Sequence, residues 1–217
     1  MTVFARELRT MAEAGTALAD GSGGARSNEG RLSFRRVGAR TVVESALAAS
    51  PLRILDCDMP VDGAVAVVLT RADRAGALRS KPVRIESLGH ATGSTLDTEY
   101  WPDMTTMASR WAADEMWAGT DLGPADVDVA QLYDGFSSMT LCWLEDLGFV
   151  KKGEAGPWFA EGRGRLGGGR LHGFGKLAEA VKQLRGECGE RQVEGAEVAL
   201  ACVGGGAIAS AMLLVAG

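Results

Sequence analysis

Histidine and proline are scarce in this sequence of 217 residues, and basic residues are not in excess. There are 2 His, and the four cysteines show no Cys-x-x-Cys spacing, so we expect no metal site built from cysteine and histidine. With 23 basic against 28 acidic residues, the net charge of −5 disfavours a nucleic-acid binder. The 6 Pro and the lack of a short repeat exclude a collagen-like chain, although there are 30 Gly.

Long hydrophobic runs are also missing. The longest apolar stretch, residues 204–217, is interrupted by glycine and is too short to span a bilayer. The first ten residues carry charges at Arg6, Glu7 and Arg9 and no apolar run, so we expect no signal peptide. The simplest expectation is a cytoplasmic protein with no membrane span and with reduced cysteine thiols.

Hydrophobic residues make up 46% of the chain and charged residues 24%, which is ordinary for a globular protein. Domains of roughly 150 residues are common, so the chain makes one or two domains with room for a sizeable core. The abundant glycines predict many tight turns and close backbone approaches.

Runs of small apolar residues predict strands that are buried on both faces. The clearest run, Ala64 to Leu69, follows an Asp-Gly turn signal. Alternation of charged and apolar residues predicts another strand over 83–90. Three more strands are predicted over residues 127–132, 196–203 and 207–215.

Apolar residues at helical spacing predict helices between these strands. Leu177, Val181 and Leu184 share one face of the best of them, over 176–185. Other helices are predicted over 3–19, over 41–49 with Thr41 as cap, over 105–117, and over 137–148 with Ser137 as cap. A Gly/Ser-rich linker is expected over 20–30. We expect Trp101, Trp111 and Trp117 to pack in the core or in a subunit contact. The element order predicts an α/β fold with a mixed sheet covered by helices.

Polar groups follow two predicted strands abruptly, at the strand ends where α/β folds place their chemistry. Tyr133 and Asp134 follow the strand over 127–132, and together they can act as a hydrogen-bond donor and an acid/base pair. A free phenol has a pKa of about 10, so at neutral pH it donates a proton or polarises a carbonyl. A tyrosine that only tethers a turn is the structural alternative.

Cys202 ends the next apolar run and precedes three glycines. The backbone N–H groups of Gly204 and Gly205 are candidates for binding a ligand or an oxyanion. The thiol of Cys202 can act as an acid/base group if its pKa is lowered. The alternative is a small buried hydrophobic residue.

His172 lies between glycine-rich sequence and the helix predicted over 176–185. A helix N-terminus lowers the pKa of an imidazole and favours its neutral form, which makes His172 a candidate catalytic group. His90 lies in a predicted strand and is expected to be structural. The Gly-x-Gly-x-x-Gly pattern over 162–167 follows no predicted strand, so we do not interpret it as a nucleotide-binding loop.

Taken in order, four segments resemble the thiolase superfamily, and most closely its sterol-carrier or lipid-transfer thiolase-like branch. They are residues 51–66, the Tyr-Asp-Gly-Phe-Ser string at 133–137, residues 169–186, and residues 190–206 with Cys202 and the triple glycine. The string at 133–137 is similar to that of the steroid side-chain aldolases. The histidine of the thiolase Gly-His-Pro motif falls at Arg170, so His172 is not a simple replacement for it.

The resemblance covers residues 40–217 and implies a thiolase-like layered fold, present as the C-terminal half plus the end of the N-terminal half. We therefore expect an N-terminal helix and flexible linker over 1–40, a remnant of the N-terminal thiolase-like domain over 41–80, and a C-terminal thiolase-like domain over 81–217. A half of this kind exposes a large apolar surface unless a homodimer or a partner covers it.

The resemblance also implies an activity on acyl-CoA thioesters, with the CoA thioester as substrate and no covalently bound cofactor. The first hypothesis is retro-aldol cleavage of a β-hydroxyacyl-CoA with a steroid or lipid side chain, in complex with a DUF35/OB-fold partner. Tyr133 would then take part in proton transfer, with His172, Asp134 and Cys202 as further candidates. The alternatives are an acetyl-CoA acyltransferase-type thiolase or lipid-transfer protein, and a non-catalytic half-thiolase scaffold subunit.

Overall fold

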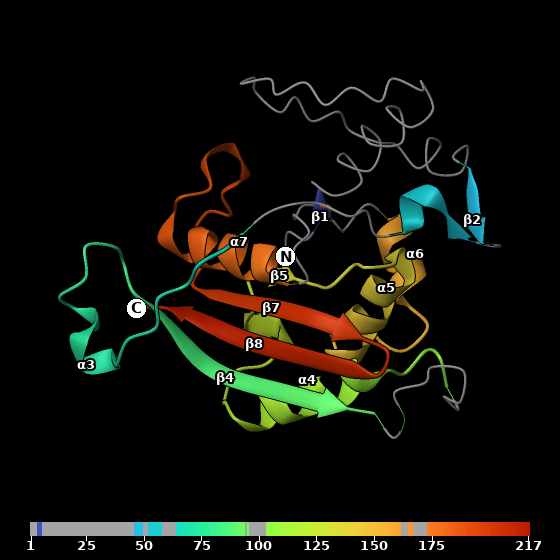
Figure 1. The fold of residues 1–217 in the computed structure, drawn as a ribbon, viewed down its shortest axis with the longest axis horizontal. Helices are drawn as coiled ribbons and strands as arrows, with labels where there is room; N and C mark the ends of the chain where they lie inside the picture. The colour runs from blue at the N-terminus through green and yellow to red at the C-terminus, as the bar shows by residue number, and fades with distance from the viewer. Residues whose placement is uncertain are drawn as a thin grey trace.

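The small apolar runs near the C-terminus form the centre of a four-stranded sheet in the computed structural model of the chain (Figure 1). Strand β7 (Val198–Gly205) pairs antiparallel with β8 (Ile208–Ala216), and β8 pairs antiparallel with β4 (Val83–Thr92). Strand β5 (Val129–Gln131) pairs parallel with β7, so the order β4-β8-β7-β5 makes a mixed sheet, as predicted. The structure describes residues 4–5, 46–49, 52–57, 64–93, 95, 103–161, 165–166 and 173–217.

Side chains along β7 alternate between two cores, because successive residues of a strand point to opposite faces. Leu200 and Cys202 belong to the larger apolar cluster, and Ala199 and Ala201 belong to the smaller one on the other face. All four are buried. A strand that is covered on both faces needs apolar residues at every position, and this explains the uninterrupted apolar run of the sequence.

Two helices cover the larger cluster. Helix α4 (Ala108–Ala118) packs across β4 and β8, and α5 (Ser137–Asp146) lies beside it. Small residues let α4 approach the sheet closely: a Cβ atom on Gly89 of β4 would lie only 1.8 Å from the backbone oxygen of Ala112. Glycine is therefore required at position 89 by the distance between helix and strand.

Helix α7 (Phe174–Arg185) lies on the opposite face, over β7 and β5. Ala180 and Leu184 are its buried contacts in the smaller cluster. The helix begins after Gly173, whose φ is +96°, and ends before Gly186, whose φ is +76°, and a left-handed glycine is a common helix stop. The predicted helix over 176–185 and the predicted covering of both sheet faces are thus confirmed.

The remaining elements are short and lie around this layered unit. They are the strands β1 (Phe4–Ala5), β2 (Leu47–Ala49), β3 (Leu52–Arg53) and β6 (Arg165–Leu166), the helices α3 (Ala72–Ala75) and α6 (Ala155–Ala160), and the 3-10 turns Ile54–Asp56, Pro124–Asp126 and Gly189–Arg191. β1 pairs parallel with β6, and β2 pairs antiparallel with β3.

The strand predicted over Ala64 to Leu69 is wrong. Residues 64–70 form no regular element, and the side chains of Val68 and Leu69 are 92% and 76% exposed. A run of this kind becomes a buried strand only when it pairs with a sheet, and residues 64–69 pair with none of the described strands, including the edge strands β4 and β5. The assignment of residues 41–80 to the remnant of a second domain stays a prediction.

Several predicted helix boundaries also differ from the structure. Residues 47–49 form β2 rather than a helix, and residues 41–45 of that predicted helix and the linker over 20–30 lie outside the described residues. In the helix predicted over 3–19, residues 4–5 form the strand β1 instead, and the other residues lie outside the described part of the chain. Ser137 is not a cap: α5 begins after Phe136, and the Ser137 hydroxyl donates to Asp56 Oδ1 at 2.9 Å instead. The acceptor of this hydroxyl is 81 residues away in the sequence, so the local sequence pattern cannot predict the bond.

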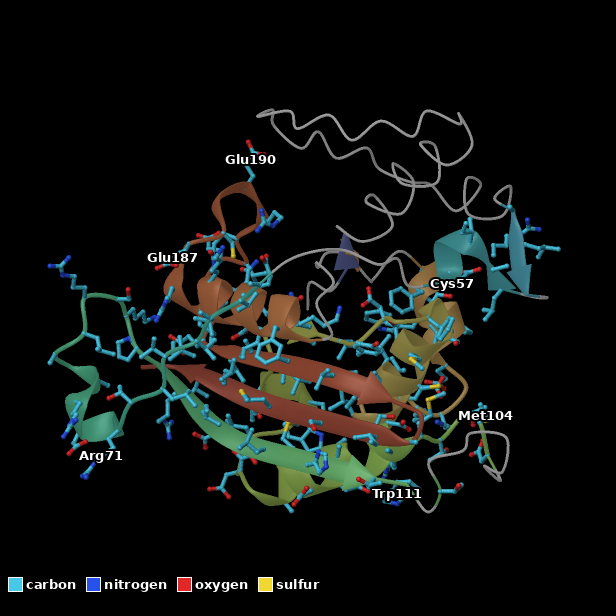
Figure 2. All side chains as sticks on the ribbon, viewed as in Figure 1. Cys57, Arg71, Met104, Trp111, Glu187 and Glu190 are labelled. Atoms are coloured by element: carbon cyan, nitrogen blue, oxygen red, sulfur yellow. The ribbon has the colours of Figure 1, made fainter. Side chains whose placement is uncertain are left out.

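The three tryptophans expected in the core or in a subunit contact have different surroundings. Trp117 packs against the larger cluster, and its indole N–H donates to the carbonyl of Leu147 at 3.2 Å. Trp111 lies half exposed on the outer side of α4 (Figure 2). Trp101 lies outside the described residues.

Candidate functional site

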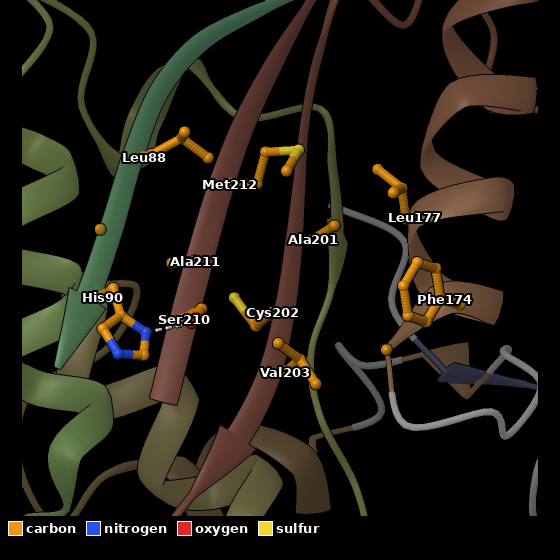
Figure 3. A pocket seen from close by; sticks show the side chains of 12 residues that line it. Leu88, His90, Phe174, Leu177, Ala201, Cys202, Val203, Ser210, Ala211 and Met212 are labelled. Carbon is orange, nitrogen blue, oxygen red and sulfur yellow. Dashed lines mark hydrogen bonds between the residues drawn. The ribbon is translucent and has the colours of Figure 1, made fainter. Parts of the chain in front are cut away.

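Three segments that are distant in sequence meet where β5 and β7 end. Because β5 and β7 are parallel, with Gln131 opposite Ala201, the loop after β5 and the end of β7 leave the sheet at the same edge. The first turn of α7 packs onto this edge: a Cβ atom on Gly173 would lie 2.6 Å from the side chain of Val203. Figure 3 shows Phe174 of α7 and Cys202 and Val203 of β7 lining the same pocket. The two strand ends that the sequence analysis singled out, those of β5 and β7, are therefore neighbours in the sheet.

A buried ion pair joins two of these segments. Lys176 Nζ, on the first turn of α7, lies 2.6 Å from Asp134 Oδ1 in the loop after β5. The Lys176 side chain is 4% exposed and that of Asp134 is 14% exposed. Charged groups are rarely buried unless they are paired, so this pair fixes the loop after β5 against α7.

Lys176 was missed by the sequence analysis. The signal was available in the helical spacing, since Lys176 precedes Ala180, Gln183 and Leu184 by four, seven and eight residues. Those three residues form the buried face of α7, and a lysine on that face must lie close to the sheet. It therefore supplies a positive charge that composition and motifs alone did not place in the site.

Tyr133 is half buried and directs its ring along the loop that follows it. A Cβ atom on Gly135 would lie 2.8 Å from the Tyr133 phenol oxygen, so glycine at position 135 makes room for the ring. The Tyr133 carbonyl accepts a bond from Thr140 Oγ1 at 3.4 Å. The ring also packs against the larger apolar cluster, and a joint action of Tyr133 and Asp134 on one ligand stays a prediction.

Cys202 is buried, with 1% of its surface exposed. Burial raises the pKa of the Cys202 thiol well above its usual range, although the nearby charge of Lys176 acts in the opposite direction. The raised pKa makes the thiol a weaker acid and disfavours the thiolate form. The lowered pKa that a base or nucleophile would need is absent at this position.

The glycines after Cys202 form the hairpin between β7 and β8. At Gly204 the φ is +75°, and a Cβ atom would lie 2.3 Å from the carbonyl oxygen of Ile208. The Gly204 carbonyl accepts from the Trp143 indole N–H at 2.9 Å, and the Gly206 N–H lies 3.0 Å from Met107 Sδ. These contacts give the triple glycine a structural reason, and ligand binding by Gly204 and Gly205 stays a prediction.

The two histidines differ in what the structure records. His172 lies outside the described residues, so its role as a candidate catalytic group stays a prediction. His90 lies on the exposed side of β4, with Nδ1 2.7 Å from Ser210 Oγ on β8. Across the described part of the chain, no three His, Cys, Asp or Glu side chains are grouped as metal ligands would be.

No helix among the described residues has the length and apolar character needed to cross a membrane. The fold and the strand-end site together define one half of a thiolase-like α/β protein. The family model described as thiolase C-terminal domain-like matches residues 91–217. The chain therefore belongs to that family, and the resemblance inferred from the motifs is confirmed.

Two curated relatives and one solved structure show which members are similar. The chain is 38% identical over 183 residues to 17-hydroxy-3-oxo-4-pregnene-20-carboxyl-CoA lyase of Mycobacterium tuberculosis, covering 76% of this chain and 47% of that protein. It is 34% identical over 155 residues to the steroid side-chain-cleaving aldolase of Thermomonospora curvata, covering 63% of this chain and 39% of that protein. The solved Ltp2-ChsH2(DUF35) aldolase aligns with a TM-score of 0.73 and 26% identity, covering 84% of this chain and 52% of that one.

An acyltransferase is also among the relatives. The chain is 38% identical over 192 residues to the acetyl-CoA acetyltransferase of Methanothermobacter thermautotrophicus, covering 80% of this chain and 50% of that protein. The chain thus spans about half the length of the curated relatives that it matches.

Proposed function

We propose that the chain is part of an enzyme that cleaves a β-hydroxyacyl-CoA thioester by retro-aldol chemistry. The observation that supports this proposal is the buried ion pair of Asp134 with Lys176, at the ends of parallel strands and in the same loop that carries Tyr133. Lyase and aldolase names among its relatives support the reaction class and the CoA thioester substrate. A steroid or lipid side chain as the acyl group follows from the same names.

The reaction needs one proton to leave the β-hydroxyl group and one to reach the α-carbon. When the hydroxyl loses its proton, the Cα–Cβ bond breaks, a carbonyl forms at Cβ, and the electron pair moves to Cα as the enolate of the thioester. Protonation of Cα then gives the shortened acyl-CoA, so the reaction consumes no external reductant or oxidant. The phenol of Tyr133 is the group that we assign to proton transfer at the β-hydroxyl.

Electrostatics in the site supports this assignment. A negative charge develops first on the hydroxyl oxygen and then on the enolate, and a positive charge held nearby stabilises both. The ammonium of Lys176 is buried, where its field is screened less than it would be in water. Asp134 holds that ammonium in place, and His172 remains a second candidate for proton transfer.

Partners belong to the same proposal. The solved aldolase of similar fold is named as a complex with a DUF35 protein, and we propose a DUF35/OB-fold protein as the partner that completes the acyl-CoA site. We also propose that the chain acts as a homodimer and in the cytoplasm, where its thiols stay reduced.

The proposal is tested by incubating the chain with a steroid β-hydroxyacyl-CoA, with and without the DUF35 partner, and measuring the carbonyl product and the shortened CoA ester by mass spectrometry. Cleavage is expected with the partner, and Tyr133→Phe is expected to lower the rate by about 10²- to 10⁴-fold, the usual contribution of a general acid/base group. Leu78→Ala is the matched control, because Leu78 is half exposed and lies outside the site. Full activity of Tyr133→Phe would refute the role of the phenol.

Acyl transfer is the second candidate function, favoured by the acetyltransferase relative and by the position of Cys202 in the C-terminal half of β7. It requires a reactive thiolate, and burial of Cys202 opposes one. Labelling of a cysteine by an acyl-CoA analogue, located by peptide mass spectrometry, would support acyl transfer over cleavage. If the chain binds a partner but turns over no acyl-CoA, the third hypothesis, a scaffold subunit, is favoured.

A further inference from the structure

Helix α5 begins without a side-chain cap of its own. Its N-cap residue is Phe136, which makes no capping hydrogen bond through its side chain, and the first turn of the helix contains no acidic residue. The first backbone N–H groups of a helix lack partners within the helix, so a negative charge close to them is stabilising. A carboxylate from a distant segment supplies this charge: Asp56 Oδ1 accepts the hydroxyl of Ser137, the first residue of α5, at 2.9 Å.

The carboxylate of Asp56 is held in this position by its own segment. Its second oxygen, Oδ2, accepts the backbone N–H of Arg53 at 2.8 Å, across the 3-10 turn that Asp56 ends. The next residue, Cys57, forms an antiparallel β-bridge with Phe136. The segment 52–57 therefore contacts the start of α5 at two adjacent points, once through a side chain and once through the backbone.

The start of α5 is joined in turn to the residue that carries the phenol. Thr140, one turn further along α5 and 4% exposed, donates to the carbonyl of Tyr133 at 3.4 Å. Backbone hydrogen bonds make a helical turn rigid, so a displacement of Ser137 is transmitted to Thr140 and from there to Tyr133. The strand β5 fixes the beginning of the loop between them, and the ion pair of Asp134 with Lys176 fixes its middle. The end of this loop depends on where α5 begins.

We propose that Asp56 is a positioning residue, which acts through Ser137 and α5 to hold the phenol of Tyr133 in the orientation that proton transfer needs. A general acid or base must lie within hydrogen-bond reach of the proton that it transfers, and a misplacement of about 1 Å can lower a rate by about 10²-fold. The catalytic consequence rests on the proposed function, whereas the effect of Asp56 on the ring of Tyr133 does not depend on any reaction.

Fluorine NMR reports on the ring of Tyr133 without the reaction. The chain has 2 Tyr, so labelling with 3-fluorotyrosine gives two resonances, and the one that is absent from Tyr133→Phe belongs to Tyr133. Asp56→Ala and Ser137→Ala are each expected to shift or broaden this resonance. Asp73→Ala is the matched control, because Asp73 is an exposed carboxylate that also accepts hydrogen bonds within its own segment, from Arg71, and it should leave the resonance unchanged.

Steady-state kinetics of cleavage in the presence of the DUF35 partner measures the catalytic consequence. Asp56→Ala is expected to lower kcat by about 10- to 100-fold while KM for the acyl-CoA changes by less than about threefold, because the contacts lead to the phenol. Ser137→Thr keeps the hydroxyl donor and should stay within about threefold of the wild-type kcat, whereas Ser137→Ala should not. The double variant Asp56→Ala/Ser137→Ala should lose no more than Asp56→Ala alone, since both substitutions break the same bond.

Three results would overturn the proposal: an unmoved Tyr133 resonance in Asp56→Ala, a wild-type kcat in that variant, or additive losses in the double variant. The far-ultraviolet circular dichroism spectrum and the urea midpoint identify a variant that fails to fold, and Ser137→Ala, at an exposed position, then replaces Asp56→Ala in both measurements. If the chain cleaves no β-hydroxyacyl-CoA while the Tyr133 resonance moves as expected, the proposed function fails and the positioning of the ring by Asp56 stands.

Discussion

Removing the carboxylate of Asp134 is expected to destabilise the fold strongly. In the folded chain Lys176 Nζ lies 2.6 Å from Asp134 Oδ1, and only 4% of the lysine side chain is exposed. Asp134→Asn keeps the size of the side chain but leaves the buried ammonium without this counter-charge. Breaking a buried ion pair from one side costs about 3–5 kcal/mol. For a chain of this length each kcal/mol lowers the midpoint of thermal unfolding by about 2–4 °C, so a loss of roughly 10 °C is expected.

The double variant Asp134→Leu/Lys176→Met distinguishes two causes of lost stability, the unpaired buried charge and a general disturbance of the loop. Replacing both charges by apolar groups leaves no unpaired charge and is often close to neutral, so most of the lost stability should return. The free energies of unfolding are measured by urea titration of wild type, both single variants and the double variant. A loss below about 1 kcal/mol in Asp134→Asn, or additive effects in the double variant, would refute the account of this pair.

Two further predictions concern buried groups on the other side of the sheet. Burial raises the pKa of the Asp146 carboxyl, against the opposing bond from Ser109, so the folded chain binds that proton more tightly than the unfolded chain. Wild type should therefore lose stability relative to Asp146→Asn as the pH rises through the raised pKa, and a difference between the two unfolding free energies that does not change with pH would contradict this. Gly89→Ala should cost about 1–3 kcal/mol or more, because its Cβ would meet the backbone of Ala112. Gly76→Ala, with open space around the position, should change the unfolding midpoint little, and equal effects of the two substitutions would be the contrary result.

The parts of the fold that the sequence predicted are those in which local pattern and burial agree. The helical spacing of apolar residues predicted α7, and the uninterrupted apolar run predicted β7, because the first is buried on one face and the second on both. The paired strand ends were found for the same reason, since polar residues follow strands buried on both faces. The family motifs then placed Tyr133 and Asp134 in the loop that the structure joins to α7.

The failures have physical causes that lie outside any local window. Residues 64–69 have the composition of a buried strand, but burial as a strand requires pairing with a neighbouring strand, and this segment pairs with none of the described ones. Serine is a common helix N-cap, but the hydroxyl of Ser137 donates a hydrogen bond to the carboxylate of Asp56 instead. Cys202 lies where an acid/base thiol was expected. Its pKa is raised because the larger apolar cluster buries it, and this burial depends on residues that are distant in sequence.

Hydrogen–deuterium exchange of the chain with its DUF35 partner, in the presence and absence of a β-hydroxyacyl-CoA, tests the central claim most directly. The claim is that the loop after β5, the first turn of α7 and the end of β7 form one acyl-CoA site. We predict slower exchange on ligand addition in peptides that cover residues 132–136, 174–178 and 201–206, with no change in α3. Protection confined to other parts of the chain, or no protection in these three segments while the ligand is bound, would contradict the claim.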